Sequence, residues 1–206
     1  MTHIVGLTGG VGCGKSVVSQ LFSELDVDVI DTDVISREIT QPHGLAIPEV
    51  EKVFGTAYLT EKGSLNREKM RKLIFSDKNS RWRLEKILHP IILRETIYRI
   101  GEAQSTYVIV VVPLLIETPD YDNIVERILV IDCDEQLQIA RTMARSKLSE
   151  QQTKAIIAAQ ATRRERLQKA DDVIINNQDI AYLTSQVTDL HKKYLYLFRP
   201  NPTIGV

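Results

Sequence analysis

Long apolar runs are absent from this chain of 206 residues, although 43% of its residues are hydrophobic. No stretch approaches the roughly eighteen consecutive apolar residues of a membrane-spanning helix, and no basic and then apolar leader is evident. Cysteine is scarce, with only Cys13 and Cys133, which argues against a disulfide framework and favours a reducing compartment. These absences predict a cytoplasmic protein with no membrane partner.

An excess of charge of one sign is also missing. Lysine and arginine number 26 against 27 aspartate and glutamate residues, for a net charge of −1. Bulk electrostatics therefore predicts no nucleic-acid partner, and any anion must be bound locally. Cysteine and histidine lack metal-ligand spacing. The sequence favours a small-molecule substrate as the partner; it does not set the oligomeric state, with which a monomer is compatible.

The chain does contain a complete phosphate-binding loop of the form G-x-x-x-x-G-K-[ST], from Gly9 to Ser16. Glycines let successive backbone N–H groups converge on a polyphosphate, Lys15 is expected to reach the β and γ phosphates, and the Ser16 hydroxyl is a natural Mg²⁺ ligand. The loop therefore predicts binding of a nucleoside triphosphate. The residues predicted to contact it are Gly10, Val11, Gly12, Cys13, Gly14, Lys15, Ser16 and Val17.

Continuous apolar runs rich in β-branched residues alternate with helical patterns along the chain. Runs of this kind, rather than alternating apolar and polar residues, are typical of strands that are buried on both faces of a parallel sheet. We therefore predict an α/β fold, with a five-stranded parallel sheet and helices on both faces. The five predicted strands are 3–8, 27–30, 107–112, 127–132 and 172–175.

A single globular unit is expected, with two helical insertions. In the first insertion Asn66 is a predicted N-cap and Pro90 is expected to kink a helix. The last residues are expected to fray. The predicted parts are a core of 1–33, 106–140 and 170–198, insertions of about 34–105 and about 141–169, and a tail of 199–206.

Asp33 follows the second predicted strand at its carboxyl end. Ligands of open α/β sheets bind outside these ends, so Asp33 is expected to face the γ phosphate and to accept or orient the proton of an attacking hydroxyl. The alternative is that Asp33 or Thr32 merely caps the helix that follows. Capping and catalysis are compatible, and Asp31 is a weaker candidate for the same roles.

Arg141 and Arg145 are spaced i, i+4, which places both on one helix face before a polar segment. An arginine that arrives from a closing lid can stabilise the transferred phosphoryl group. With Arg163 and Arg164 across the segment, the four residues resemble a clamp. The alternative is a solvated charged face. Asp132 ends a strand as a Mg²⁺-binding carboxylate would, but its function stays open.

Several segments taken together resemble the dephospho-coenzyme A kinase family, and they span nearly the whole chain. The phosphate loop is generic, but its ordered combination with His-Pro and Val-Pro-Leu-Leu-Ile-Glu is specific to that family. The segments that carry the resemblance are 6–16, 29–33, 54–55, 63–67, 89–90, 112–117, 160–163 and 170–174.

The resemblance implies a P-loop nucleotide-kinase fold with an acceptor-binding insertion and a lid. It also implies ATP and Mg²⁺ as cofactors, and transfer of the γ phosphate to the ribose 3′-hydroxyl of dephospho-coenzyme A. Asp33 matches the base, Lys15 and Ser16 match the phosphate and Mg²⁺ contacts, and Arg141 matches the lid arginine. The other residues implied are Asn177 beside the nucleotide, and Arg37, His89, Leu115 and Glu117 near the acceptor.

The chain departs from the family pattern at a few positions. Val17 stands where threonine is common, which removes a hydroxyl but keeps the backbone donor. Gln178 stands where glycine is common, in the loop after Asn177. Cys13 replaces a small serine; at a helix N-terminus beside Lys15 its thiol is expected to have thiolate character and to react with alkylating reagents unless nucleotide covers it. His89, which most simply fills the kink at Pro90, becomes an expected pocket wall.

Two other functions are compatible with a phosphate loop. One is a kinase for another small hydroxyl compound or nucleotide. The other is a GTP-dependent switch, against which the chain lacks an Asn-Lys-x-Asp segment to read guanine and an Asp-x-x-Gly segment to sense the γ phosphate. Nucleotide preference separates a switch from a kinase.

Overall fold

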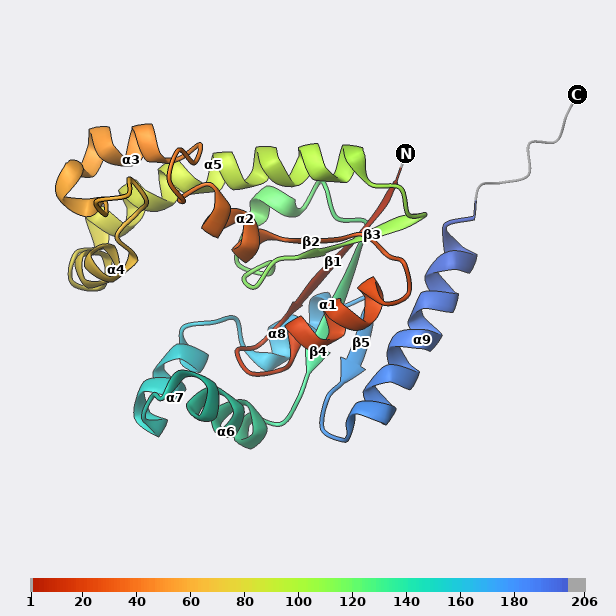
Figure 1. Ribbon diagram of the computed structural model, residues 1–206. Helices are drawn as coiled ribbons and strands as arrows, with labels where there is room; N and C mark the ends of the chain where they lie inside the picture. The colour runs from red at the N-terminus through yellow and green to blue at the C-terminus, as the bar shows by residue number, and fades with distance from the viewer. Residues whose placement is uncertain (1, 200–206) are drawn as a thin grey trace, which may run out of the picture. The chain divides into compact units, whose positions relative to one another are not determined.

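The structure is a computed structural model that describes residues 2–199. Its strands form one sheet in the order β2-β3-β1-β4-β5 (Figure 1). The registers place β1 between β3 and β4, parallel to both, so the predicted five-stranded parallel sheet is confirmed. The strands are β1 (His3–Gly9), β2 (Val29–Asp31), β3 (Tyr107–Val111), β4 (Arg127–Asp132) and β5 (Asp172–Ile175).

The second strand lies later in the sequence than the predicted 27–30. Val27 donates its N–H to the carbonyl of Phe22 at 3.2 Å, so it belongs to the turn that leaves the preceding helix. Apolar side chains alone do not mark where such a turn ends, which explains the shift.

The chain divides into two compact units, of which the first contains residues up to Ile30 and from Ile100 onward, and the second contains Asp31–Arg99. The first unit holds the sheet and α1 (Lys15–Ser23), η2 (Pro119–Tyr121), α6 (Glu135–Ser146), α7 (Glu150–Ala158), α8 (Arg163–Lys169) and α9 (Ile180–Leu197). The second unit holds α2 (Thr32–Glu38), α3 (Ile47–Phe54), η1 (Thr56–Tyr58), α4 (Arg67–Ser76) and most of α5 (Lys78–Glu102).

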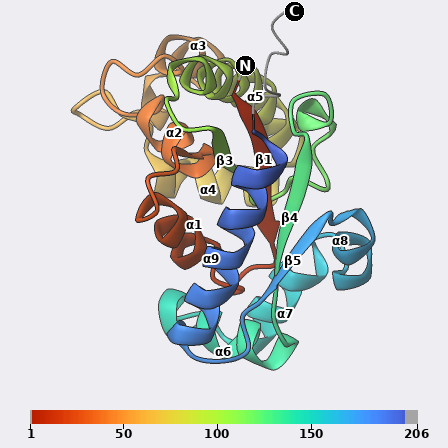
Figure 2. The ribbon, with the colours of Figure 1, turned by 90° about the vertical axis from the view of Figure 1, so that its right-hand side faces the viewer.

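The core of the first unit lies where α1 and α9 pack together beside the sheet (Figure 2). Leu7, Phe22 and Tyr107 are at most 1% exposed. Tyr107 meets the rings of Phe22 and Tyr194 edge-on, with centroids 6.5 and 5.2 Å away. Burial of these large side chains is the main stabilisation of the sheet that carries the phosphate loop.

A polar cluster joins the edge strand β5 to its neighbours. The side chain of Asp172 is only 3% exposed and binds Arg127 of β4 at 3.0 Å, the Tyr194 hydroxyl of α9 at 3.0 Å, and the Lys193 ammonium. Burial acts to raise the pKa of Asp172, but the hydrogen bonds from Lys193, Arg127 and Tyr194 outweigh it, so the pKa lies below its ordinary value.

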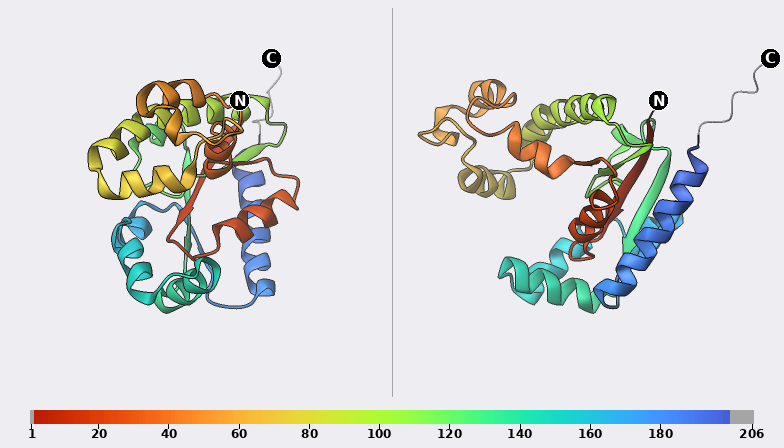
Figure 3. Two further views of the ribbon diagram at one scale, coloured as in Figure 1. Left: turned by 60° about the vertical axis from the view of Figure 1, so that its left-hand side comes forward. Right: turned by 45° about the vertical axis from the view of Figure 1, so that its right-hand side comes forward.

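Three helices lie between β4 and β5, and of these α6 and α7 pack against each other (Figure 3). Both α7 and α8 begin with a capping box, from Ser149 to Gln152 and from Thr162 to Glu165. The predicted lid segment is therefore built from separate short helices with well-defined starts. Within residues 2–199, no helix is long and apolar enough to cross a bilayer.

The second unit confirms one predicted helix start. The Asn66 side chain accepts the Lys69 N–H at 3.0 Å and caps α4. Pro90 lies inside α5, which continues as one 25-residue helix on both sides of it. Its missing N–H does not end the helix, and the kink stays a prediction.

Candidate functional site

The phosphate loop connects the carboxyl end of β1 to the start of α1, as the sequence predicts. Gly14 precedes the helix in a left-handed conformation, with φ of 95°, that suits glycine. The Lys15 ammonium donates hydrogen bonds to the carbonyls of Gly9 at 2.7 Å and Gly10 at 3.2 Å. The lysine thus lies folded over the loop, where it can exchange carbonyl oxygens for phosphate oxygens.

Residues far along the chain hold this loop. The Asn176 side chain donates to the Cys13 carbonyl at 2.8 Å, and the Val11 N–H donates to the Gln160 side chain at 3.0 Å. On α6, Gln138 and Thr142 are each 2% exposed and lie against the loop glycines. The motif does not predict these supports, although Gln160 belongs to a segment that carries the family resemblance.

Cys13 and Cys133 meet in the core beneath the loop. Both are 0% exposed, and their sulfur atoms are 3.3 Å apart as free thiols. The hydrogen bond from Cys133 lowers the pKa of Cys13 to about 7, with Lys15 and Arg166 acting in the same direction and burial against them. The expected thiolate character has a structural basis, but the expected reactivity does not, since a fully buried thiol is closed to alkylating reagents.

The arginines of the predicted clamp have different environments. Arg141 is half-buried on α6 and donates to the Asn176 carbonyl at 3.0 Å. Arg163 instead forms a bidentate ion pair with Asp132, which is 5% exposed, with Nε–Oδ1 and Nη2–Oδ2 distances of 2.9 and 2.6 Å. A buried carboxylate needs such a partner, so Arg163 is a structural counter-ion rather than a free clamp residue. Arg145 is exposed.

Three further predicted contacts also support the fold. The Asn177 side chain accepts the Asp134 N–H at 2.9 Å and fixes the start of α6. Leu115 is 4% exposed and packs over Gly6, so its expected contact with a substrate stays a prediction for a buried side chain. The Glu117 carboxylate accepts the N–H of Ala161 at 2.7 Å. This bond ties the segment after β3 to the turn before α8.

Asp33 lies exposed in the first turn of α2, in the second unit. The N-cap of this helix is Asp31, whose side chain accepts the N–H groups of Asp33 and Val34 at 2.8 and 3.4 Å. The alternative that Asp33 or Thr32 caps the helix is therefore wrong. Because Asp31 caps the helix, the prediction that Asp33 is a catalytic carboxylate still stands as a prediction.

Positive charges gather near Asp33 in the same unit. Arg67 donates to the Thr40 hydroxyl at 2.6 Å and to the Ser36 carbonyl at 3.3 Å. Its pKa is lowered by partial burial first and then by the charges of Arg37 and Arg71, while Asp33 acts in the opposite direction. Arg37 and Arg71 are therefore close enough to Arg67 to act on its charge, and an anion bound among the three would offset their repulsion. Sequence reasoning singled out Arg37 but not Arg67 or Arg71.

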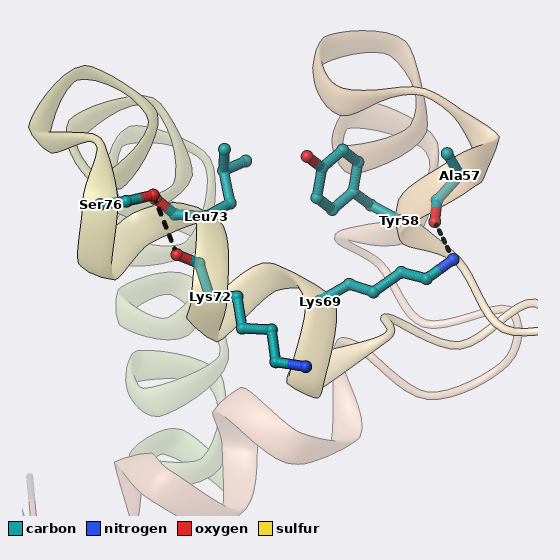
Figure 4. Close-up of a pocket in the computed structure, with 6 residues that line it drawn as sticks. All are labelled: Ala57, Tyr58, Lys69, Lys72, Leu73 and Ser76. Carbon is teal, nitrogen blue, oxygen red and sulfur yellow. Dashed lines mark hydrogen bonds between the residues drawn. The ribbon is translucent and has the colours of Figure 1, made fainter.

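The second unit also contains an open hollow of about 410 Å³ between η1 and α4. Figure 4 shows Tyr58 and Leu73 turned toward one another across it, with Lys69 bonded to the Ala57 carbonyl at its rim at 3.2 Å. Apolar walls beside ammonium groups suit a ligand with both apolar and anionic parts. His89, a predicted pocket wall, is exposed on α5. The hollow is lined by Ala57, Tyr58, Lys69, Lys72, Leu73 and Ser76.

A metal ion in the candidate active site would be bound at the phosphate loop. Among residues 2–199, no group of three or more histidine, cysteine, aspartate or glutamate side chains could hold an ion. Ser16 is exposed in the first turn of α1, directly after the lysine, so its hydroxyl fits a Mg²⁺ that is held mainly by nucleotide phosphates.

Comparison with known proteins identifies the family of this chain. The family model for dephospho-CoA kinase matches residues 3–182. The dephospho-CoA kinase of Nitrosomonas europaea is 51% identical over 97% of this chain and 98% of its own, and that of Nitrosospira multiformis is 50% identical over 94% and 97%. The solved dephospho-CoA kinase of Campylobacter jejuni superposes with a TM-score of 0.71 at 25% identity, over 94% of this chain and 97% of its own. The chain therefore belongs to the dephospho-CoA kinase family, whose members are ATP-dependent kinases.

Proposed function

We propose that this protein transfers the γ-phosphoryl group of Mg-ATP to the ribose 3′-hydroxyl of dephospho-coenzyme A, giving ADP and coenzyme A. The observation that carries the proposal is the family match, which covers residues 3–182 and so includes both the phosphate loop and the unit that contains Asp33. A small-molecule acceptor also agrees with the near-zero net charge. Two free thiols agree with a cytoplasmic location.

On the donor side, the loop N–H groups and the N-terminus of α1 bind the phosphates. Lys15 leaves the carbonyls of Gly9 and Gly10 and donates to the β and γ phosphates, where it offsets the charge that spreads over the phosphoryl oxygens. Ser16 would hold Mg²⁺, which supplies further charge neutralisation on the phosphates. Arg141 is proposed to add positive charge from α6, as the family resemblance implies, with Asn177 beside the nucleotide.

On the acceptor side, the Asp33 carboxylate takes the proton of the attacking 3′-hydroxyl as the new O–P bond forms and the bond to ADP breaks. The guanidinium groups of Arg37, Arg67 and Arg71 are proposed to bind the pyrophosphate of dephospho-coenzyme A, because this part of the acceptor carries its concentrated negative charge. His89 and Glu117 remain proposed acceptor contacts.

A coupled assay of ADP release tests the proposal. Dephospho-coenzyme A should support turnover, whereas adenosine, which has the same 3′-hydroxyl but no pyrophosphate, should support it at least about a hundredfold less well, as expected when charge-assisted hydrogen bonds to the acceptor are lost. Turnover confined to adenosine or other nucleosides would refute the assignment of the acceptor and leave a kinase for another hydroxyl compound. Mass spectrometry of the product, with a gain of one phosphoryl group, confirms transfer rather than hydrolysis.

A further inference from the structure

A side chain from the predicted lid segment accepts a hydrogen bond from a backbone N–H of the phosphate loop. The Val11 N–H donates a hydrogen bond of 3.0 Å to the Gln160 Oε1 atom, across 149 positions of the sequence. Val11 lies within the loop whose backbone N–H groups hold phosphate oxygens. The amide oxygen of Gln160 therefore sits where an anion's oxygen would accept the same proton.

Gln160 reaches this position from a well-anchored turn between α7 and α8. The next residue, Ala161, donates its N–H to the Glu117 carboxylate at 2.7 Å, and its carbonyl accepts from Arg166. The capping box of Thr162 then starts α8. The Gln160 N–H itself donates to the Ile157 carbonyl at 3.1 Å, so this residue joins the end of α7 to the anchored turn.

Two more polar atoms face the loop from α6. Among the residues that the structure describes, Gln138 Oε1 and Thr142 Oγ1 are buried side-chain atoms without a hydrogen-bond partner. They lie within 2.8 Å of where a Cβ on Gly10 or Gly12 would be, so they point at the loop itself. Unsatisfied buried acceptors cost free energy, and a rearranged loop N–H would satisfy them. Two polar atoms without a partner therefore lie against the loop in this structure.

We propose that Gln160 is a positioning residue. Its side-chain oxygen accepts the Val11 N–H in the absence of nucleotide, and a phosphate oxygen of the nucleotide replaces it there on binding. A phosphate accepts this proton in a charge-assisted hydrogen bond, roughly twice as strong as the neutral bond to an amide oxygen, so the exchange favours the nucleotide. Loss of the Gln160 contact releases the end of α7, and occupancy of the loop thereby sets the arrangement of the lid segment. The proposal rests on the proposed use of ATP, but not on the identity of the acceptor.

Binding of Mg-ATP to three variants tests the exchange, without any acceptor present. Gln160→Ala removes the competing oxygen, so the dissociation constant should stay equal or fall by up to about fivefold, the size of one neutral hydrogen bond. Gln160→Glu keeps the shape but places a carboxylate against the phosphates, and should raise the dissociation constant at least about tenfold. Gln168→Glu makes the same charge change on the exposed surface of α8 and should have less than about a threefold effect.

Hydrogen exchange separates positioning from a purely structural role. Mg-ATP should change the exchange of residues 150–162 in the wild-type protein, and this response should be lost in Gln160→Ala although the variant still binds ATP. A dissociation constant raised more than threefold by Gln160→Ala, or equal effects of Gln160→Glu and Gln168→Glu, would overturn the exchange. A wild-type protein that fails to bind Mg-ATP would overturn both proposals, whereas ATP binding without transfer to dephospho-coenzyme A would overturn the acceptor assignment alone.

Discussion

Replacement of Gly12 by alanine should damage the phosphate loop, although the sequence motif leaves this position open. Gly12 has a φ of +77°, which costs an L-residue about 1–2 kcal/mol. An added Cβ would also lie 2.6 Å from the Gln138 carbonyl oxygen and 3.1 Å from its Cα, both backbone atoms of α6. Overpacking against atoms that cannot rotate away costs about 1–3 kcal/mol, so we expect a total loss of about 2–5 kcal/mol of unfolding free energy.

Gly63 provides a matched control for the backbone strain. Its φ is +82°, but a Cβ there would meet nothing within 4 Å. Gly63→Ala should therefore show only the strain of about 1–2 kcal/mol, and the difference between the two variants isolates the clash with α6. Urea unfolding followed by circular dichroism measures both losses. Calorimetric titration with Mg-ATP should show at least a tenfold weaker affinity for Gly12→Ala alone, because its loop N–H groups must shift.

Equal losses of stability in the two variants would refute the reasoning. In that case the contact between Gly12 and Gln138 would be loose enough to accept a methyl group, and α6 would not pack on the loop as closely as the structure indicates. Unchanged ATP affinity in Gly12→Ala, with stability lost as expected, would show that the loop donors do not depend on this packing.

Three other substitutions test separate parts of the molecule. Asp33→Asn should keep ATP affinity within about threefold but lose about 10²–10⁴ in kcat, and near-normal turnover in the coupled assay would contradict its role as a base. Arg67→Gln should raise KM for dephospho-coenzyme A about tenfold or more, with a smaller effect on KM for ATP; equal effects on both would count against an acceptor role. Asp172→Asn should cost about 1–3 kcal/mol at neutral pH, because charge-assisted hydrogen bonds are lost while Arg127 and Lys193 stay partly solvated. Because folding lowers the pKa of Asp172, its stabilisation is full above about pH 5 and is lost as pH falls through the lowered pKa. Urea unfolding should therefore show the stabilities of the wild-type and Asp172→Asn proteins converging in acid. A difference in stability that stays constant with pH would contradict this role of Asp172.

Local patterns predicted most of the architecture because their causes are local. Four of the five strands lie within one residue of their predicted bounds, since continuous β-branched runs favour buried parallel strands whatever surrounds them. The Asn66 cap is likewise predicted from neighbouring residues, because the side chain bonds the N–H only three positions later. The shifted strand at Val29–Asp31 shows where this stops, since the turn before it is closed by a backbone bond to Phe22.

Adjacent polar residues were harder to assign. The sequence places Asp31, Thr32 and Asp33 together after a strand, and any of them could cap the helix that follows. The choice depends on where the strand ends and on the extended backbone of Asp31, with φ and ψ of −103° and 116°. Those angles are set by the strand's pairing in the sheet, which single-residue propensities do not contain. The cap belongs to Asp31, and the catalytic role of Asp33 stays a prediction.

The sequence alone was enough to predict nucleotide binding through Gly9–Ser16, because eight consecutive residues carry the chemistry of the motif. The partners around the loop come from tertiary contacts: Gln160 accepts from the Val11 N–H, Cys133 lies against Cys13, and Arg163 neutralises Asp132. These partners are 149, 120 and 31 positions apart. Contacts at such separations follow from the crossover connections of a parallel sheet, which bring distant segments to one end of it, and no spacing within the sequence records them.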